Sequence, residues 1–245
     1  MGYASIVFSE RLEEIDQYLC LLEVLEEQTR HGVPKIEGTG YSIQAGQLRV
    51  LYSSVYLQLY NLIEVTVALC LEMVAEAAQQ NWKPSQLNDN ILREWIRSTA
   101  RTHIDLDYEK RLDATFELCS SIFLSQPVSD FSIARGGGGN WDDVAIERIS
   151  RRIGLNLTIS NAVKKGIKIP VKDNMGSLVL VKELRNKLAH GEISFYSCSE
   201  SVTAGELRLL VDRTGNYLKE VVQQFENYVR KHEFLTPENR PSTSV

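Results

Sequence analysis

The sequence has few of the residues that build metal sites and disulfide networks. Its 245 residues include only four cysteines, which are far apart and form no CxxC pair. This spacing gives no support to a zinc site or to disulfide bonds, and we expect neither a metal nor a cofactor. Three of the cysteines stand in apolar helical patterns, where we expect small buried side chains: Cys20, Cys70 and Cys119.

Patterns that direct a chain to a membrane are also missing. We find no run of 18 apolar residues, the length that indicates a transmembrane helix. The N-terminal stretch has no basic region followed by a long apolar core, so it does not resemble a secretory signal. Ile6 stands where a myristoylation motif requires Ser or Thr. By elimination we expect a cytoplasmic protein without a membrane partner.

Charge is unevenly distributed along the chain. The formal net charge is −5, and residues 1–30 contribute seven acids against two bases. Residues 141–190 instead hold ten bases and five acids, which gives this segment a net charge of +5. A basic segment in an acidic protein is compatible with a polyanion that docks there. A solvated charged face is the alternative interpretation.

Apolar residues recur at helical spacing along most of the chain. The first pattern predicts a helix that begins after an N-cap at Ser9 and stops near Gly32. A much longer pattern covers residues 44–80 and predicts close packing along an antiparallel partner. Further helices are predicted near 84–96, 107–123, 142–153, 176–190 and 204–232, the second of these with Leu112, Phe116 and Cys119 on one face. The sequence therefore predicts an all-α fold in one domain, residues 1–245.

Two stretches resemble a phosphate-binding loop and a DNA-binding helix-turn-helix, each only in part. Gly136–Gly139 has no Lys-Ser/Thr after it and no strand pattern before it, so we expect a flexible loop and not a phosphate-binding loop. Residues 146–166, IERISRRIGLNLTISNAVKKG, faintly resemble a helix-turn-helix. A DNA-binding regulator therefore remains one alternative.

The stretch LRNKLAHGE, residues 184–192, combines residue types suited to phosphodiester chemistry. His190 could move a proton near neutral pH, and Arg185 could hold a phosphate with its planar set of donors, while Asn186 could orient either side chain. Five residues advance a helix so that Arg185 and His190 project about 140° apart. They can therefore meet only if the helix ends at Gly191 and frees His190, or if a second copy supplies the missing half. A plain helix C-terminus with favourable positive charge is the alternative.

The fuller stretch VKELRNKLAHGE resembles the signature of the HEPN superfamily, in which an arginine, a polar residue and a later histidine form an R-x4–6-H motif. The resemblance implies a HEPN-like helical bundle with long antiparallel helices. Its core would be approximately 44–80 and 176–232, with an inserted helical segment at approximately 84–170. It also implies that Arg185, Asn186 and His190 are catalytic. The supporting residues would come from the earlier helix YLQLYNLIEVTV: Asn61 and Glu64, with Tyr60 near them.

For function, the resemblance implies a metal-independent endoribonuclease of the toxin–antitoxin or phage-defence type. Such an enzyme acts as a homodimer with a composite site at the interface, and an antitoxin or defence-system protein is an expected partner. We expect Lys182, Lys187, Arg151 and Arg152 to bind RNA. The position that carries a modifiable tyrosine in one toxin subgroup is Glu192 here, so that mode of control is not expected. The alternative is a non-catalytic HEPN module that binds a partner protein or a nucleotide.

Overall fold

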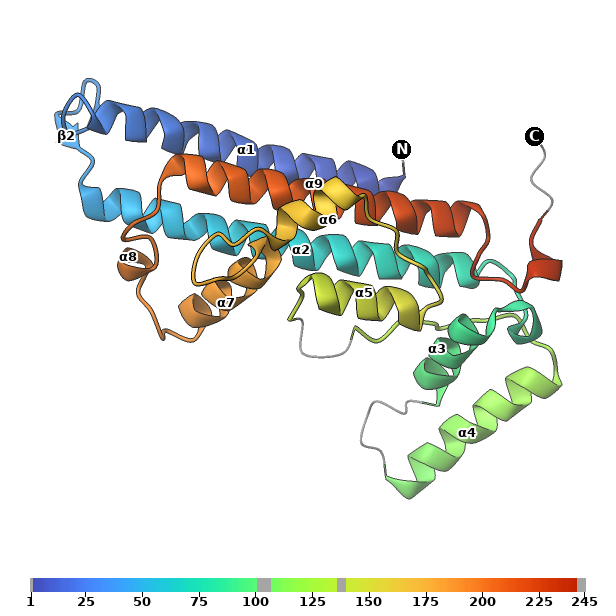
Figure 1. Cartoon of the computed structure of the whole chain (residues 1–245). Helices are drawn as coiled ribbons and strands as arrows, with labels where there is room; N and C mark the ends of the chain where they lie inside the picture. Colours follow the sequence, from blue (N-terminus) through green and yellow to red (C-terminus); the bar gives the residue numbers. More distant parts are fainter. Residues whose placement is uncertain (1, 101–106, 136–139, 242–245) are drawn as a thin grey trace.

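The computed structural model describes residues 2–100, 107–135 and 140–241. Its core is a bundle of three long helices, α1 (Tyr3–Thr29), α2 (Ala45–Ala78) and α9 (Ala204–Arg230), each packed against the other two (Figure 1). α1 runs antiparallel to α2 and α9, which share one direction. The strands β1 (Lys35–Ile36) and β2 (Tyr41–Ser42) form a short antiparallel hairpin between α1 and α2. The predicted all-α fold is confirmed.

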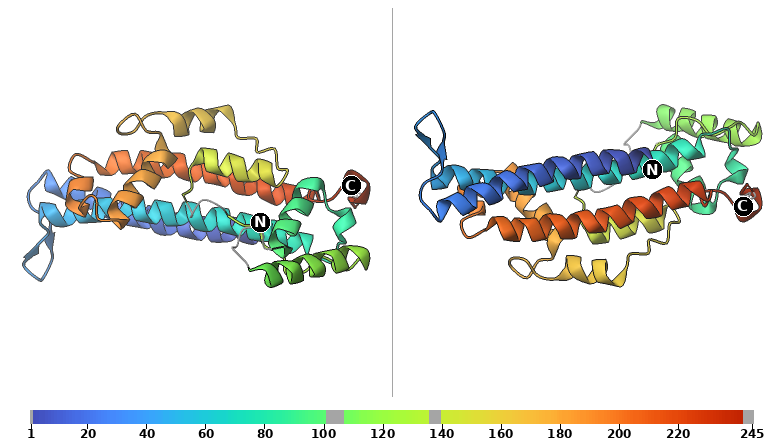
Figure 2. Two further views of the ribbon diagram at one scale, coloured as in Figure 1. Left: turned by 90° about the horizontal axis from the view of Figure 1, so that it is seen from below. Right: turned by 90° about the horizontal axis from the view of Figure 1, so that it is seen from above.

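Shorter elements flank this bundle. Two of them pack on α2, namely α7 (Ser177–Ala189) and α8 (Phe195–Cys198), while α6 (Asn161–Lys168) packs on α9. α5 (Asp143–Arg152) lies on the same side of the bundle as α7 (Figure 2). The end of the bundle opposite the hairpin carries η1 (Pro84–Gln86), α3 (Asp89–Thr99), α4 (Tyr108–Phe123) and η3 (Pro237–Asn239).

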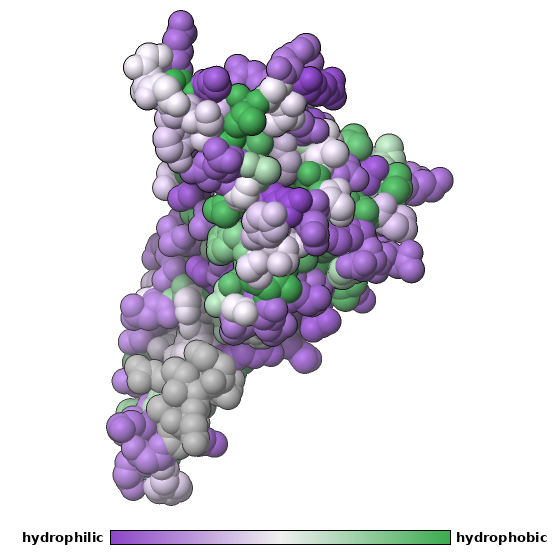
Figure 3. Space-filling view, turned by 90° about the vertical axis from the view of Figure 1, so that its left-hand side faces the viewer, coloured by the Kyte–Doolittle hydropathy of each residue, from purple (hydrophilic) through white to green (hydrophobic). Residues whose placement is uncertain are grey.

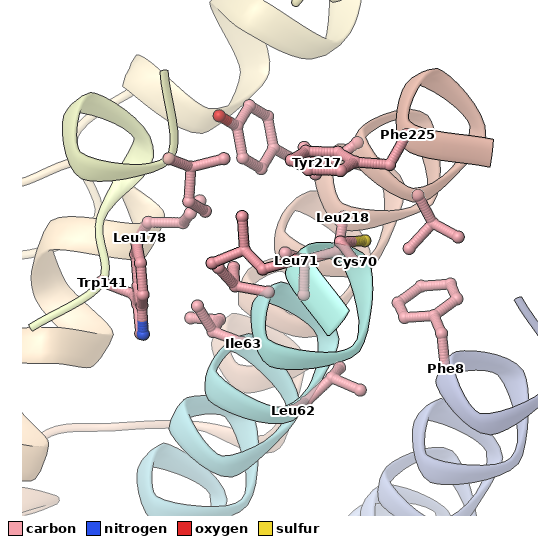
Figure 4. Close-up of a cluster of buried hydrophobic side chains, with 14 of the residues drawn as sticks. Phe8, Leu62, Ile63, Cys70, Leu71, Trp141, Leu178, Tyr217, Leu218 and Phe225 are labelled. Atoms are coloured by element: carbon pink, nitrogen blue, oxygen red, sulfur yellow. The ribbon is translucent and has the colours of Figure 1, made fainter. Parts of the chain in front are cut away.

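The core is one continuous cluster of buried apolar side chains. Every long helix contributes to it, and α7 and the segment before α5 close it from the side (Figure 4). In the first helix, the predicted apolar stripe is buried at Phe8, Ile15, Leu19 and Leu22. Labelled members from the other elements are Leu62, Ile63, Cys70 and Leu71 of α2, Tyr217, Leu218 and Phe225 of α9, Leu178 of α7, and Trp141.

α2 is apolar on more than one side because it lies between several neighbours. Among the described helices it alone is long and apolar enough to cross a membrane, with a mean hydropathy of 1.5 over 18 residues, and 56% of that window is buried inside the protein. The chain still contains no uninterrupted run of 18 apolar residues, because polar residues such as Gln58, Asn61 and Glu64 interrupt this helix. Contacts of α2 with α1, α9, α7 and α8 account for its apolar composition without a membrane.

Three local predictions need correction. α1 begins at Tyr3, so Ser9 is not its N-cap; Ser9 lies inside the helix and its hydroxyl donates to the Ser5 carbonyl at 2.8 Å. The helix starts earlier because Ala4 is already buried in the core. Cys70 is buried as expected, whereas Cys20 and Cys119 are exposed. Periodicity placed these cysteines on helices, but it could not show which helical faces have a neighbour.

The surface carries apolar side chains mainly in small groups. The end with the hairpin is largely hydrophilic with scattered hydrophobic residues (Figure 3). α4 is an exception, because the apolar face predicted from its sequence is exposed in the described part of the chain. Its exposed apolar side chains are Tyr108, Leu112, Phe116, Ile122 and Phe123.

The structure tests only one of the two stretches that resemble a phosphate-binding loop and a helix-turn-helix. Gly136–Gly139 lies outside the described residues. In the second stretch, α5 and α6 are separated by residues 153–160, whereas a helix-turn-helix joins its helices by a turn of about three or four residues. Ser160 also donates through its backbone N–H and its hydroxyl to Glu220 on α9, which fixes α6 against the bundle. The helix-turn-helix interpretation is therefore wrong.

A buried carboxylate joins α3 to α5. Glu94 is 1% exposed, and its Oε1 forms an ion pair with Arg97 on its own helix and a second one with Arg152 Nε at 3.0 Å. Two cations compensate the desolvation of one buried acid, so removal of the acid leaves both of them unpaired. This cluster holds α3 and α5 to each other.

Replacing Glu94 should therefore destabilise the protein. We expect Glu94→Gln to lower the free energy of unfolding by about 2 kcal/mol, below the value for a fully buried pair because both arginines are partly exposed. The measurement is urea denaturation followed by circular dichroism. Glu72→Gln, at an exposed position of α2, serves as the control and should change stability by less than about 0.5 kcal/mol. Equal effects of the two substitutions would contradict the structural role of Glu94.

Candidate functional site

The LRNKLAHGE stretch forms the C-terminal half of α7 and the turn that follows. His190 is the C-cap, and Gly191 has φ of +70°, the left-handed region that ends a helix. The Gly191 N–H donates to the Leu188 carbonyl at 3.2 Å, and the Glu192 N–H donates to the Lys187 carbonyl at 2.9 Å. These two bonds make a Schellman motif, so the predicted role of Gly191 as helix terminator is confirmed.

Arg185 is held by side chains from two helices. Its guanidinium lies over the ring of Tyr60 on α2, with 3.9 Å between Cζ and the ring centroid. Nη2 lies 3.8 Å from Oε2 of Glu64, one helical turn beyond Tyr60 on α2. Tyr60 is 2% exposed, and burial raises the pKa of its hydroxyl, although the Arg185 cation acts in the opposite direction. The aromatic face and the carboxylate therefore fix a cation at the surface of α7.

Asn186 connects Arg185 to the segment that precedes α5. Its Oδ1 accepts a hydrogen bond of 2.7 Å from Arg185 Nη1, and its Nδ2 donates to Asn140 Oδ1 at 3.1 Å. Asn186 therefore orients the arginine, one of the two roles that its position in the motif suggested. The remaining N–H donors of Arg185 form no hydrogen bond with any residue in the described ranges, so they are available to an anion.

His190 is exposed, and no residue in the described ranges orients its ring. Within residues 2–100, 107–135 and 140–241, its ring makes no hydrogen bond or ion pair. Its backbone is close to helical, with φ of −89° and ψ of 0°, so the end of the helix does not swing the side chain toward Arg185. The angular separation expected for a continuous helix, about 140°, therefore persists within one chain.

The two supporting residues predicted on α2 face different neighbours. Glu64 lies beside Arg185, as expected. Asn61 lies instead toward α1, where its Oδ1 accepts a hydrogen bond of 3.3 Å from Arg11 Nη1. Residues 60 and 64 share one helical face and residue 61 is turned by about 100°. The position of Asn61 therefore does not agree with the expected support of the motif.

The four residues expected to bind RNA also differ in their surroundings. Lys182 Nζ donates to Asp142 Oδ2 at 2.8 Å, and Arg152 pairs with Glu94. The hydrogen bond to Asp142 raises the pKa of Lys182; burial alone would raise the pKa of Asp142, but Lys182 and the Ala145 N–H hold it below its usual range. Lys187 is half-buried and Arg151 is exposed; neither side chain has a polar partner among the described residues.

Asn140 is a site residue that the sequence did not reveal. It joins Asn186 to the segment before α5 through a contact between residues 46 positions apart. Asn140 lies outside any helical pattern and belongs to no motif, so no local signal points to it. Tyr60, in contrast, was found through the likeness of the early helix to the HEPN pattern.

Comparisons with known proteins give one match. A family model described as HEPN_MAE_28990-like HEPN matches residues 6–234, which covers the helical bundle together with α3 to α6. No curated protein and no solved structure matches the chain.

Two glycine substitutions test the turn that ends α7 at Gly191. A methyl group at Gly191 would have open space around it, so the cost of Gly191→Ala comes only from the positive φ, and we expect a loss of about 1 kcal/mol in unfolding free energy. Gly205, within α9, also has open space but a helical backbone. Gly205→Ala should therefore stabilise by about 0.5 kcal/mol. Denaturant midpoints of the two variants measure this, and the same sign of change in both would contradict the assigned turn.

Proposed function

The chain belongs to the HEPN_MAE_28990-like HEPN family, and from this membership we propose that it is a metal-independent endoribonuclease of the toxin–antitoxin or phage-defence type. Family membership by itself suggests an RNA-related or defence-type module. The observation that carries the finer proposal is the Arg185 guanidinium, fixed by Tyr60, Glu64 and Asn186 with donors left over. A fixed, partly desolvated set of donors is what stabilises charge that develops on a phosphate.

The proposed reaction uses the nucleophile that RNA itself carries. The 2′-hydroxyl attacks the adjacent phosphorus, the bond to the 5′-oxygen breaks, and the products are a 2′,3′-cyclic phosphate and a 5′-hydroxyl. His190 takes the proton from the 2′-hydroxyl or gives one to the departing 5′-oxygen. Arg185 binds the non-bridging oxygens, where negative charge accumulates. Asn186 positions Arg185 through the 2.7 Å hydrogen bond.

A second copy of the chain completes this site. Arg185 and His190 project in different directions from α7, and nothing in the described part of one chain turns the histidine toward the arginine. A two-fold axis near the end of α7 would place Arg185 of one copy beside His190 of the other. We therefore propose a homodimer located in the cytoplasm, regulated by an antitoxin or defence-system protein.

A non-catalytic HEPN module that binds a partner protein is the second candidate. The observation that favours it is the uncovered apolar face of α4, with Leu112, Phe116 and Phe123 at 51%, 71% and 85% exposure. Apolar side chains grouped on one surface helix are typical of a protein interface. This candidate requires that the pure protein leaves RNA intact and that substitution of His190 has no effect on partner binding.

Cleavage of RNA is the direct test of the first proposal. Wild-type protein, His190→Ala and the control His31→Ala are incubated with cellular RNA in EDTA, and the fragment ends are identified. We expect His190→Ala to reduce cleavage by at least about 100-fold, because a general acid–base group contributes that much or more. His31, exposed beyond the end of α1, should be dispensable. A requirement for a divalent metal, or equal cleavage by all three proteins, would contradict the mechanism.

Mixing two inactive variants tests the composite site. Arg185→Ala and His190→Ala are each expected to be inactive and dimeric by sedimentation. A heterodimer of the two retains one Arg185 and one His190 on different chains, so mixing and subunit exchange should restore part of the cleavage activity. If the site were formed within one chain, the mixture would remain inactive. A monomer at all concentrations would also count against the proposal.

A further inference from the structure

A basic pocket adjoins the motif. It has a volume of about 380 Å³ and lies between α5, α7 and the segments that flank residues 136–139. This volume falls within the usual range of about 300–1,000 Å³ for ligand sites. Four cationic side chains and one acid line it: Arg135, Arg148, Arg152, Lys182 and Asp142.

The cations of the basic pocket are only partly neutralised. Glu94 compensates Arg152, and Asp142 compensates Lys182. Arg148 is exposed, follows the same face of α5 four residues before Arg152, and has neither an ion pair nor a hydrogen bond with any described residue. Like charges at this helical spacing repel one another. An anion in the pocket would relieve that repulsion and pair with Arg148.

The wall of the basic pocket offers donors but no exposed aromatic face. Trp141 lines the pocket with an indole that is 3% exposed, and its buried Nε1 has no hydrogen-bond partner among the described residues. A base could not stack on a buried ring. Arginine and lysine side chains donate hydrogen bonds, so the pocket matches phosphate oxygens better than it matches a base.

The pocket is continuous with the catalytic motif. Asn140, on its rim, accepts the hydrogen bond from Asn186. Lys182 and Asn186 are four residues apart on α7 and therefore face the same way. A strand whose scissile phosphate lies at Arg185 thus meets the basic pocket next along the same surface.

We propose that the basic pocket holds a backbone phosphate of the bound RNA strand, adjacent to the phosphate at Arg185. This inference rests on the proposed ribonuclease function and names a second contact of that site. Because the contact is to the backbone, it contributes affinity and register without base specificity. Its strength should depend on salt, since phosphate neutralisation releases counterions.

The test measures binding without cleavage. The probe is a short single-stranded RNA with 2′-O-methyl groups, which has no free nucleophile, and its dissociation constant is measured at several KCl concentrations. We expect Arg148→Ala to weaken binding about five- to tenfold at low salt and to reduce the slope of log K against log salt by about 0.7. Arg93→Ala removes an exposed arginine of α3 outside the pocket and should change affinity less than about twofold. Circular dichroism verifies that both variants are folded.

Each outcome decides the assignment. Equal affinities of Arg148→Ala and Arg93→Ala, or no binding of the probe by wild type, would overturn it. A mononucleotide that binds as tightly as the strand would overturn the choice of strand phosphate in favour of a free nucleotide. Because the probe cannot be cleaved, the two proposals fail separately. Cleavage of ordinary RNA with Arg148-independent binding rejects only the pocket, and Arg148-dependent binding without cleavage rejects only the ribonuclease.

Discussion

The apolar side chains of α2 have to be removed from water on several sides of one helix, and the packing of the other elements follows from that requirement. α1 and α9 cover two sides, and α7 and α8 cover a third. Once α7 lies on α2, the turn of α2 that faces it carries Tyr60 and Glu64, four residues apart on one face. The burial that stabilises the bundle thereby also places an aromatic ring and a carboxylate under Arg185.

This packing gives Arg185 and His190 different surroundings. Arg185 is held by a ring face, an amide and a carboxylate, each of which restricts the guanidinium in another direction. His190 is the exposed C-cap of the same helix, and its side chain has no polar partner within the described part of the chain. Under the proposed function, a well-oriented phosphate binder with an unoriented proton carrier would be half of an active site. That asymmetry is the physical argument for the proposed homodimer, in which a second copy would offer the complementary half.

Sequence periodicity predicted the features that the local sequence determines, namely where helices run and where they end. The pattern at 44–80 corresponds to Ala45–Ala78, and Gly191 ends α7 as its place after the last helical residue indicated. Periodicity could not predict which side chains from distant parts of the chain contact one another. It could not assign Glu64 to α7 and Asn61 to α1, because the two residues are three positions apart and project only about 60° from each other around the helix. It likewise could not show that the apolar face of α4 is uncovered, or that Asn140 contacts Asn186.

The net charge of −5 and a polyanionic substrate are compatible because the charges are separated in space. The acidic α1 lies on the opposite side of α2 from α5 and α7, which border the basic pocket (Figures 1 and 2). Asp16 and Glu23 of α1 are also bound by Arg208 of α9, at 2.7 and 2.8 Å. One helix diameter is about 10 Å, and the Debye length at physiological ionic strength is about 8 Å. An RNA strand at the proposed phosphate site would therefore experience mainly the local arginines, which would guide its approach to the face that carries Arg185.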